Sequence, residues 1–186
     1  MKKPSTSVII LVVLGVLLLY GLFSYNGFIT LNEQVDGQWA QVEAQYQRRF
    51  DLIPNLVESV KGIMKQEQTI FTALADARTR YAGAQTPNAR ASAAGEVETA
   101  LGRLLVIMEN YPQLRSSETV QTLMTQLEGT ENRISVERVR FNDIVRIYNT
   151  KTKRFPGSLL ATLFSFGERA YFEFAQGAEN APAVSF

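Results

Sequence analysis

The chain contains no cysteine and no histidine among its 186 residues. The absence of cysteine excludes disulfides, thiolate metal sites, cysteine nucleophiles and a lipoprotein anchor. The absence of histidine removes the usual general base, the commonest zinc ligand and the usual pH-sensing side chain. We therefore expect no catalytic residues, no metal site and no cofactor.

The sequence also lacks an excess of charge of either sign. Lysine and arginine number 19 and aspartate and glutamate 18, and no basic run follows Lys2 and Lys3. Affinity for nucleic acid comes mostly from neutralising phosphates, so a nearly neutral chain excludes nucleic acid as a partner. Because 46% of the residues are hydrophobic, we expect one folded domain with a real core plus a targeting segment.

The longest run without charge lies near the N-terminus. Val8–Phe23 reads VIILVVLGVLLLYGLF, and extension to Ile29 gives about 22 residues or about 33 Å of helix, close to a hydrocarbon core. We predict a transmembrane anchor at 8–29 after a cytoplasmic segment at 1–7. The alternative is a cleaved signal peptide, but 19–24 offers no pair of small residues at the spacing that cleavage needs.

The orientation of this anchor follows from the basic residues near its ends. Lys2 and Lys3 precede the apolar run, whereas the first basic residue after it is Arg48. The positive-inside rule then places the N-terminus in the cytoplasm. We expect a single-pass protein of the bacterial inner membrane whose body is periplasmic.

Beyond the anchor, apolar residues recur at alternating spacings of three and four. The repeat predicts an all-α fold, an antiparallel up-and-down four-helix bundle over 30–153. Its first and last helices carry the clearest pattern: Phe28, Leu31, Val35, Trp39, Val42, Tyr46, Phe50 and Ile53, then Val120, Met124, Leu127, Glu131, Ile134, Arg138, Phe141, Val145 and Tyr148.

Charges interrupt the first repeat at Arg48, Arg49 and Asp51, and Pro54 follows. Asp51 is a good N-cap, and Pro54 would then fall in the first turn of a new helix, where its missing N–H does little harm. We predict a chain reversal at 50–52, which makes the three charged residues an exposed, membrane-distal corner. The alternative is one long kinked helix through Pro54, because the apolar phase almost survives the interruption.

Glu131 and Arg138 occupy core positions in an otherwise apolar repeat. Burying either charge alone is costly, so both need partners. The candidates are Arg48, Arg49, Asp51, Asn55, Glu58, Glu67 and Glu109. We predict a buried polar network of Glu131, Arg138 and Glu109 that fixes helix register. The alternative, a carboxylate metal site in the bundle, calls for Glu-x-x-His motifs that this chain lacks.

A second apolar segment, at 154–175, follows the bundle. Its sequence FPGSLLATLFSF contains Leu159, Leu160, Leu163, Phe164 and Phe166, which are too few to span a bilayer. We predict a membrane-proximal segment, either a short helix that caps the bundle or an interfacial helix in the outer leaflet. Residues 176–186 are predicted to be a disordered tail.

Five stretches of the chain resemble the LemA family: WAQVEAQYQRRFDLIPNLVESVKG (39–62), ENYPQLRSSETVQTLMTQLEGTENRI (109–134), RVRFNDIVRIYN (138–149), FPGSLLATLFSF (155–166) and YFE (171–173). The resemblance implies one N-terminal membrane helix, a four-helix bundle and no established enzymatic activity or cofactor. A magnetosome protein of that family is tied to membrane invagination. Family genes also neighbour those of TPM-domain membrane proteins and membrane proteases.

Together these features favour a membrane-anchored helical-bundle scaffold that contacts membrane lipid, forms a homo-oligomer and supports membrane organisation or envelope stress handling. The alternatives are an adaptor that docks a membrane protease or a TPM-domain membrane protein and, least favoured, an enzyme. The candidate interaction surfaces are Arg48, Arg49 and Asp51, and the apolar residues Leu159, Leu160, Leu163, Phe164 and Phe166.

Overall fold

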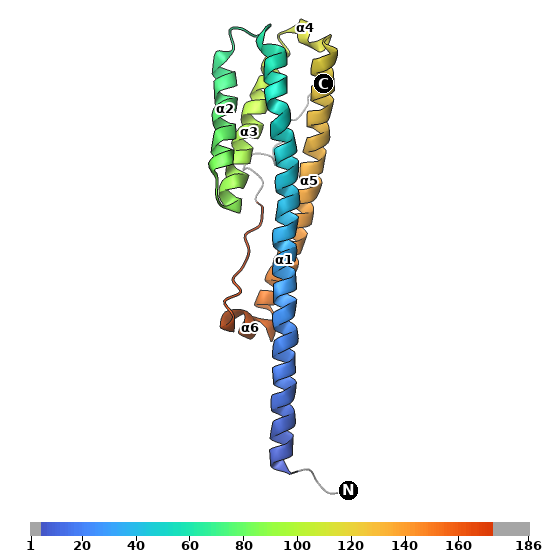
Figure 1. Ribbon diagram of the computed structural model, residues 1–186, viewed down its shortest axis with the longest axis vertical. Coiled ribbons are helices and arrows are strands. Elements are labelled where there is room, and N and C mark those ends of the chain that lie inside the picture. The colour runs from blue at the N-terminus through green and yellow to red at the C-terminus, as the bar shows by residue number, and fades with distance from the viewer. Residues whose placement is uncertain (1–4, 173–186) are drawn as a thin grey trace, which may run out of the picture. The chain divides into compact units, whose positions relative to one another are not determined.

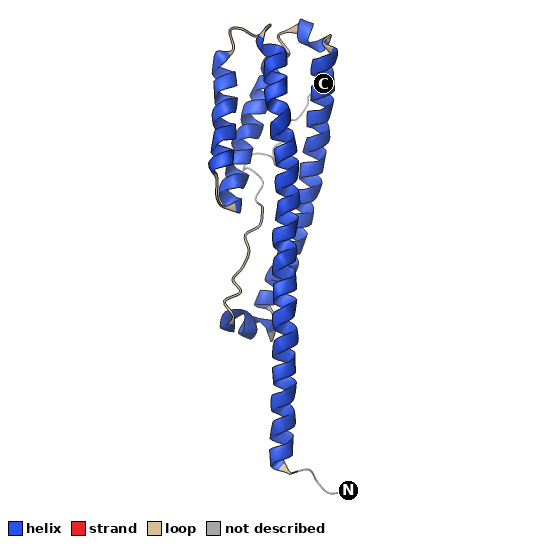
Figure 2. Ribbon diagram, viewed as in Figure 1, coloured by secondary structure: helices blue, strands red, loops and turns tan. Residues whose placement is uncertain are grey.

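The computed structural model describes residues 5–172, and in this part of the chain every regular element is a helix (Figure 2). The predicted all-α class is confirmed. The elements, labelled in Figure 1, are α1 (Thr6–Lys61), α2 (Gln68–Gly83), α3 (Pro87–Met108), α4 (Pro112–Arg115), α5 (Glu118–Lys153) and α6 (Gly157–Leu163). The predicted tail at 176–186 lies outside the described residues.

The described chain divides into two compact units. The first contains residues 5–38 and 141–171, and the second contains residues 39–140 and Phe172. Helices α1 and α5 each contribute residues to both units. Of the segment predicted as bundle, residues 30–38 and 141–153 thus belong to the first unit.

Helix α1 runs without interruption for 56 residues and includes Pro54. The predicted reversal at 50–52 is therefore wrong, and the alternative of one helix through the proline is the arrangement found. A proline inside a helix costs about 3 kcal/mol. Around it, Phe50, Ile53 and Leu56 are at most 3% exposed, and each such side chain gains about 1.5–3 kcal/mol by burial. The continuous apolar face outweighs the proline.

The chain leaves α1 only after Lys61, at the turn formed by 62–67. Asp51 therefore caps no helix. It is exposed within α1, where its Oδ1 accepts a 2.7 Å hydrogen bond from Nε2 of Gln47, one turn earlier. A pair at this spacing supports a helix from its surface and does not mark its start.

The second unit is a four-helix bundle built from residues 39–61 of α1, from α2 and α3, and from residues 118–140 of α5. Arg49 and Tyr46 of α1 meet Glu131 and Arg138 of α5, respectively, so these two helices run antiparallel. Helices α2 and α3 lie side by side as an antiparallel hairpin (Figure 1). The predicted up-and-down arrangement is confirmed. Its first turn lies at 62–67 and not at the predicted 50–52.

The core of this bundle is made by the repeat positions read from the sequence. Its fully buried apolar side chains come from all four helices: Val42, Tyr46, Ile53, Leu56, Val60, Leu74, Ala94, Val97, Leu101, Leu104 and Ile134. Helix α3 begins at a cap that its sequence supplies, because Thr86 accepts a hydrogen bond from the Ala89 amide and Pro87 occupies the first turn.

The first unit is organised around Phe28 of α1, which is fully buried. Its ring stacks on Phe166 at 5.0 Å and meets Tyr148 of α5 edge to face at 6.4 Å. Helix α6 packs against the same residue through Gly157, which lies buried beside the Phe28 ring. A short apolar helix is thereby attached to α1 at the C-terminal end of the apolar run.

That run makes α1 the one helix in the described residues that is long and apolar enough to cross a membrane. Its large side chains from Val8 to Leu19 are all at least half exposed. Length and composition thus agree with the predicted span at 8–29.

Candidate functional site

Two arginines lie inside the bundle of the second unit. Arg49 of α1 and Arg138 of α5 are only 8% and 9% exposed. A charge at such depth requires a partner, because an unpaired ion in the interior is strongly unfavourable. We therefore treat the surroundings of these arginines as the candidate site.

Arg138 is held by an acid and a phenol. Its Nη2 donates to Oε1 of Glu98 on α3 at 2.7 Å and to the hydroxyl of Tyr46 on α1. The Tyr46 hydroxyl in turn donates to Glu98 at 3.2 Å. Arg138, Glu98 and Tyr46 thus form a closed triad that joins three helices.

Aromatic rings cover the same guanidinium. The Cζ of Arg138 lies 4.6 Å from the ring centre of Phe172 and 5.3 Å from that of Tyr46. Phe172 is buried, and its ring also packs on Trp39 at 6.0 Å. Rings at these distances attract a cation through their negative faces, so they add to the stabilisation of Arg138.

Arg49 forms the second pair, with Glu131 of α5. Glu131 keeps 46% of its side-chain surface exposed, whereas Arg49 keeps 10%. The pair therefore reaches from the core to the surface. Since the two ion pairs use α1, α3 and α5 at fixed positions, they specify how these helices align.

Burial sets the titration of these groups. It lowers the pKa of Arg49, a shift that the charge of Glu98 opposes. It raises the pKa of Glu98, and here Arg49 acts in the opposite direction. It lowers the pKa of Arg138 to about 10. With a pKa of about 10, Arg138 is a cation at neutral pH, and Glu98 is the acid that pairs with it.

A third pair flanks this cluster. Glu43 of α1 binds Arg90 of α3 and accepts a 2.6 Å hydrogen bond from the indole N–H of Trp39. Tyr81 of α2 lies nearby, and burial, followed by the charge of Glu43, raises its pKa to about 12 while Arg90 opposes the shift. Ion pairs and rings therefore join every helix of the bundle.

This arrangement joins the helices of the bundle through ion pairs and aromatic contacts. The described residues contain no group of three or more acidic side chains placed to bind a metal ion. Arg49 and Arg138 are covered by carboxylates and aromatic rings, whereas Glu43, Arg78, Tyr81 and Arg90 line an open cleft at the surface of the bundle. The role of the predicted network in fixing helix register stays a prediction.

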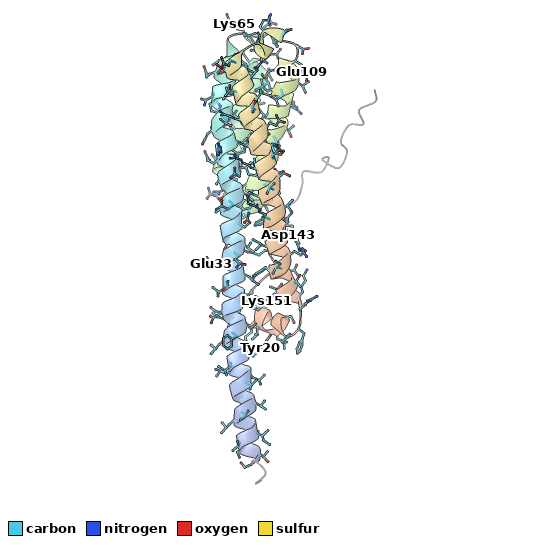
Figure 3. The ribbon with its side chains drawn as sticks, turned by 90° about the vertical axis from the view of Figure 1, so that its right-hand side faces the viewer. Tyr20, Glu33, Lys65, Glu109, Asp143 and Lys151 are labelled. Atoms are coloured by element: carbon cyan, nitrogen blue, oxygen red, sulfur yellow. The ribbon has the colours of Figure 1, made fainter. Side chains whose placement is uncertain are left out.

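The structure brings some predicted network residues together and separates others. Glu131 and Arg138 are both in the cluster, but the acid that meets Arg138 is Glu98 and not Glu109. Glu109 is exposed at the C-cap of α3, about three helical turns beyond Glu98. Figure 3 places it with Lys65 at the same end of the bundle.

The predicted corner of Arg48, Arg49 and Asp51 does not exist as a corner. All three lie within α1, because the helix continues to Lys61. Arg48 and Asp51 are exposed, while Arg49 points into the core. A helix places neighbouring residues about 100° apart, so adjacent arginines cannot share one surface.

The apolar residues predicted after the bundle divide between two environments. Leu159 and Leu163 of α6 are 64% and 72% exposed, and Phe164 is 44% exposed. Leu160 is half-buried, and Phe166 packs on Phe28 and on Tyr25. Part of this segment therefore belongs to the core of the first unit, and part remains an open apolar surface.

Sequence reasoning missed Glu98 and Phe172. A signal for Glu98 was present, because Ala91, Ala94, Glu98, Leu101, Leu105 and Met108 alternate three and four along α3. Glu98 therefore occupies a core position of its own helix, as Glu131 and Arg138 do. Phe172 carried no such signal, since it lies outside any helical repeat.

Comparison with known proteins gives a family match and several relatives. The LemA family model matches residues 38–186. Two proteins of Paramagnetospirillum magneticum, Magnetosome protein MamQ 1 and MamQ 2, are each 28% identical over 200 residues, covering 92% of this chain and 74% of the relative. Magnetosome protein MamQ of Magnetospirillum gryphiswaldense is 30% identical over 177 residues, covering 81% of this chain and 65% of the relative. The family resemblance is confirmed: the chain belongs to the LemA family.

Proposed function

We propose that this protein is a membrane-anchored scaffold that self-associates through its helical bundle and organises the bacterial inner membrane. The observation that carries the proposal is the continuity of α1, because one helix supplies both the apolar run and a helix of the bundle. A bundle without a turn between itself and its anchor is suited to hold partners at the membrane surface. The periplasmic placement of the bundle belongs to the same proposal.

Two further observations support a scaffold over an enzyme. The buried charges of the bundle are used in ion pairs between helices, and the described residues contain no acidic cluster suited to a metal. Relatives named as magnetosome proteins support a part in membrane organisation, and envelope stress handling is a related role.

A surface for self-association is present on α5. Val136 and Val139 are 49% and 53% exposed, and they lie on the opposite side of the helix from the buried Ile134. Exposed β-branched residues three positions apart on a helix are suited to pack against a second copy of the same helix.

The test uses single cysteines, because the chain has none of its own. Val139→Cys in full-length protein is expected to form a disulfide-linked dimer in native membranes, while Arg133→Cys, exposed on another side of α5, should form much less. Light scattering on the detergent-solubilised protein should give a mass above one chain. A measured mass equal to one chain, together with no crosslink at either position, would contradict the proposed scaffold.

One observation favours an adaptor as the second candidate. An apolar groove between α2 and α3 is lined by Ile70, Ala73, Val106 and Ile107, with Glu67 and Arg103 at its edges, and Val106 is 65% exposed. A helix of a membrane protease or of a TPM-domain protein would fit such a groove. A single-chain protein that gains mass only with that partner would favour this role.

A further inference from the structure

Helix α6 has two apolar faces, and one of them packs against the rest of the first unit. Gly157 and Ala161 are buried, whereas Leu159 and Leu163 are 64% and 72% exposed. At about 100° per residue, the two pairs lie about 200° apart around the helix. A helix that packs on protein and faces water carries polar residues on its outer side. The leucines indicate that the outer side of α6 faces something other than water.

Within the first unit, α6 lies beside the end of the apolar run of α1. Tyr25 of α1 contacts Phe164 edge to face at 4.9 Å and Phe166 at 5.8 Å. Tyr25 lies within the predicted span, four residues before its end at Ile29. The exposed Leu22 and Ile29 of α1 lie one turn before and one turn after Tyr25 on the same side of that helix. The open face of α6 thus continues the apolar surface of the membrane-spanning helix.

Basic residues lie beside this apolar surface. Lys151, Lys153 and Arg154 precede α6 directly. The Lys151 ammonium lies 4.5 Å from the centre of the Phe28 ring and 3.5 Å from the Ser24 carbonyl oxygen, and Figure 3 shows Lys151 next to α6. Lys and Arg at the level of the headgroups attract anionic lipids.

We propose that α6 is an interfacial helix that inserts Phe155, Leu159 and Leu163 between the lipids of the leaflet from which α1 emerges. Arg154, exposed directly after α5, binds the anionic headgroups above it, whereas Lys153 is paired with Glu168 at 2.8 Å. This inference rests on the proposed anchoring of α1 in the membrane. Helix α6 then widens the protein at one leaflet only, which is the geometry by which a wedge crowds lipid on one side of a bilayer.

The depth of α6 can be measured with single-cysteine variants of the cysteine-free chain. Leu159→Cys and Leu163→Cys, each in full-length protein, carry an environment-sensitive fluorophore in vesicles of phosphatidylethanolamine and phosphatidylglycerol. Spin-labelled lipids quench this fluorophore either near the headgroup or deep in the acyl chains. Val13→Cys in the span and Arg133→Cys in the bundle are the matched controls.

The shallow quencher should remove more fluorescence than the deep quencher at 159 and 163. The order should reverse at 13, and neither quencher should act at 133. In vesicles of phosphatidylcholine alone, quenching at 163 should weaken, and equal quenching there would overturn the part assigned to anionic headgroups.

Quenching at 13 without quenching at 159 and 163 overturns the inference and leaves the anchor intact, as would happen if a second protein copy covered α6. Loss of quenching at 13 overturns the anchor and the inference together.

Discussion

Arg138 shows how one residue connects most of the bundle. It binds Glu98 of α3 and Tyr46 of α1 from its own position on α5, and Phe172 covers it. Its lowered pKa of about 10 reflects the cost of burial. Such a residue contributes specificity of alignment more than net stability, because a buried pair roughly offsets its own desolvation.

Replacing Arg138 alone should therefore destabilise the bundle. Arg138→Leu leaves Glu98 and Tyr46 without their cationic partner, and removing one member of a buried pair costs about 3 kcal/mol at the low end. The low end applies because Glu98 keeps 24% exposure. Loss of about 3 kcal/mol lowers the melting temperature by about 6–12 °C in a chain of this size, measurable by circular dichroism in detergent.

The matched controls separate charge from packing. Arg133→Leu, exposed on the same helix, should change stability by no more than about 0.5 kcal/mol. The double variant Arg138→Leu/Glu98→Leu should regain most of the loss, because neither charge is then buried alone. A double variant as unstable as the sum of its singles would contradict this account.

The raised pKa of Tyr81 predicts that the stability of the fold decreases in the alkaline pH range. Its folded-state pKa of about 12 lies above the ordinary value of 10, chiefly because of burial. The protonated phenol therefore stabilises the fold fully below pH 10, and this contribution is lost as the pH rises to about 12. The lowered pKa of Arg138 acts in the opposite direction over the same range.

Tyr81→Phe isolates the phenol, since Arg138 is unchanged in both proteins. The stability of the wild type relative to Tyr81→Phe should fall between pH 10 and pH 12 and stay constant below pH 10. Denaturation followed by circular dichroism at each pH measures this difference. Parallel curves for the two proteins through pH 12 would show that Tyr81 does not titrate in this way.

Gly157 is required by a close approach of backbones. A Cβ at this position would lie 2.5 Å from the Lys151 carbonyl oxygen and 3.6 Å from the Phe28 ring. Gly157→Ala should therefore displace α6 at a cost of about 1–3 kcal/mol, as overpacking does. Hydrogen exchange of the peptides that cover α6 should become faster.

A glycine-to-alanine substitution at position 129 should have the opposite effect and increase stability. Gly129 lies within α5, where a Cβ would meet nothing within 4 Å. Gly129→Ala should stabilise the helix by about 0.5–1 kcal/mol. A loss of stability at 129 would contradict the open surroundings described for Gly129. Unchanged exchange in α6 of Gly157→Ala would argue against the packing described for the first unit.

At the scale of helices, the apolar repeat predicted most of what the structure contains. The core positions of α1 and α5 are buried as their spacing indicates, from Val42 and Tyr46 to Ile134 and Val145. The predicted boundary at 50–52 is wrong because the burial of Phe50 and Ile53 outweighs the local cap chemistry of Asp51 and Pro54. Local cap chemistry describes what a residue permits, and tertiary burial decides whether the helix ends.

The candidate site also could be predicted only in part from the sequence. A buried charge can be recognised in a repeat, as Glu131 and Arg138 were, but its partner depends on which helix faces it. The pairing of Arg138 with Glu98 required the alignment of α3 against α5. Phe172 required the path of the chain after α6, for which no periodicity exists.

A substitution of Pro54 tests whether the burial of the apolar face of α1 outweighs the cost of a proline inside the helix. Because the proline lies inside a helix whose apolar face is buried, Pro54→Ala should restore a backbone hydrogen bond. The expected gain is up to about 3 kcal/mol and a melting temperature higher by up to about 6–12 °C.

Pro87→Ala is the control, since Pro87 begins α3, where a proline is well tolerated. Its change should stay within about 0.5 kcal/mol. A melting temperature that does not rise in Pro54→Ala would mean that the proline is needed for a kink that improves packing.

At the scale of the whole molecule, orientation in the membrane decides which compartment the bundle serves. In the folded protein, Lys151 lies against the C-terminal end of the apolar run, so a positive charge is also present at that end. Insertion responds instead to residues within about 15–20 positions of the span. Lys151 is far beyond that limit along the chain, so the orientation proposed from Lys2 and Lys3 is unchanged by the fold.

Two single-cysteine variants of the full-length protein test this orientation. Glu128→Cys, exposed on α5, should react with a membrane-impermeant maleimide in cells whose outer membrane alone is permeable. Ser5→Cys, at the exposed start of the chain before α1, should react only after the inner membrane is broken. The opposite pattern would place the bundle in the cytoplasm. It would also move the leaflet proposed for α6 to the cytoplasmic side, because Tyr25, Phe164 and Phe166 tie α6 to the end of the span.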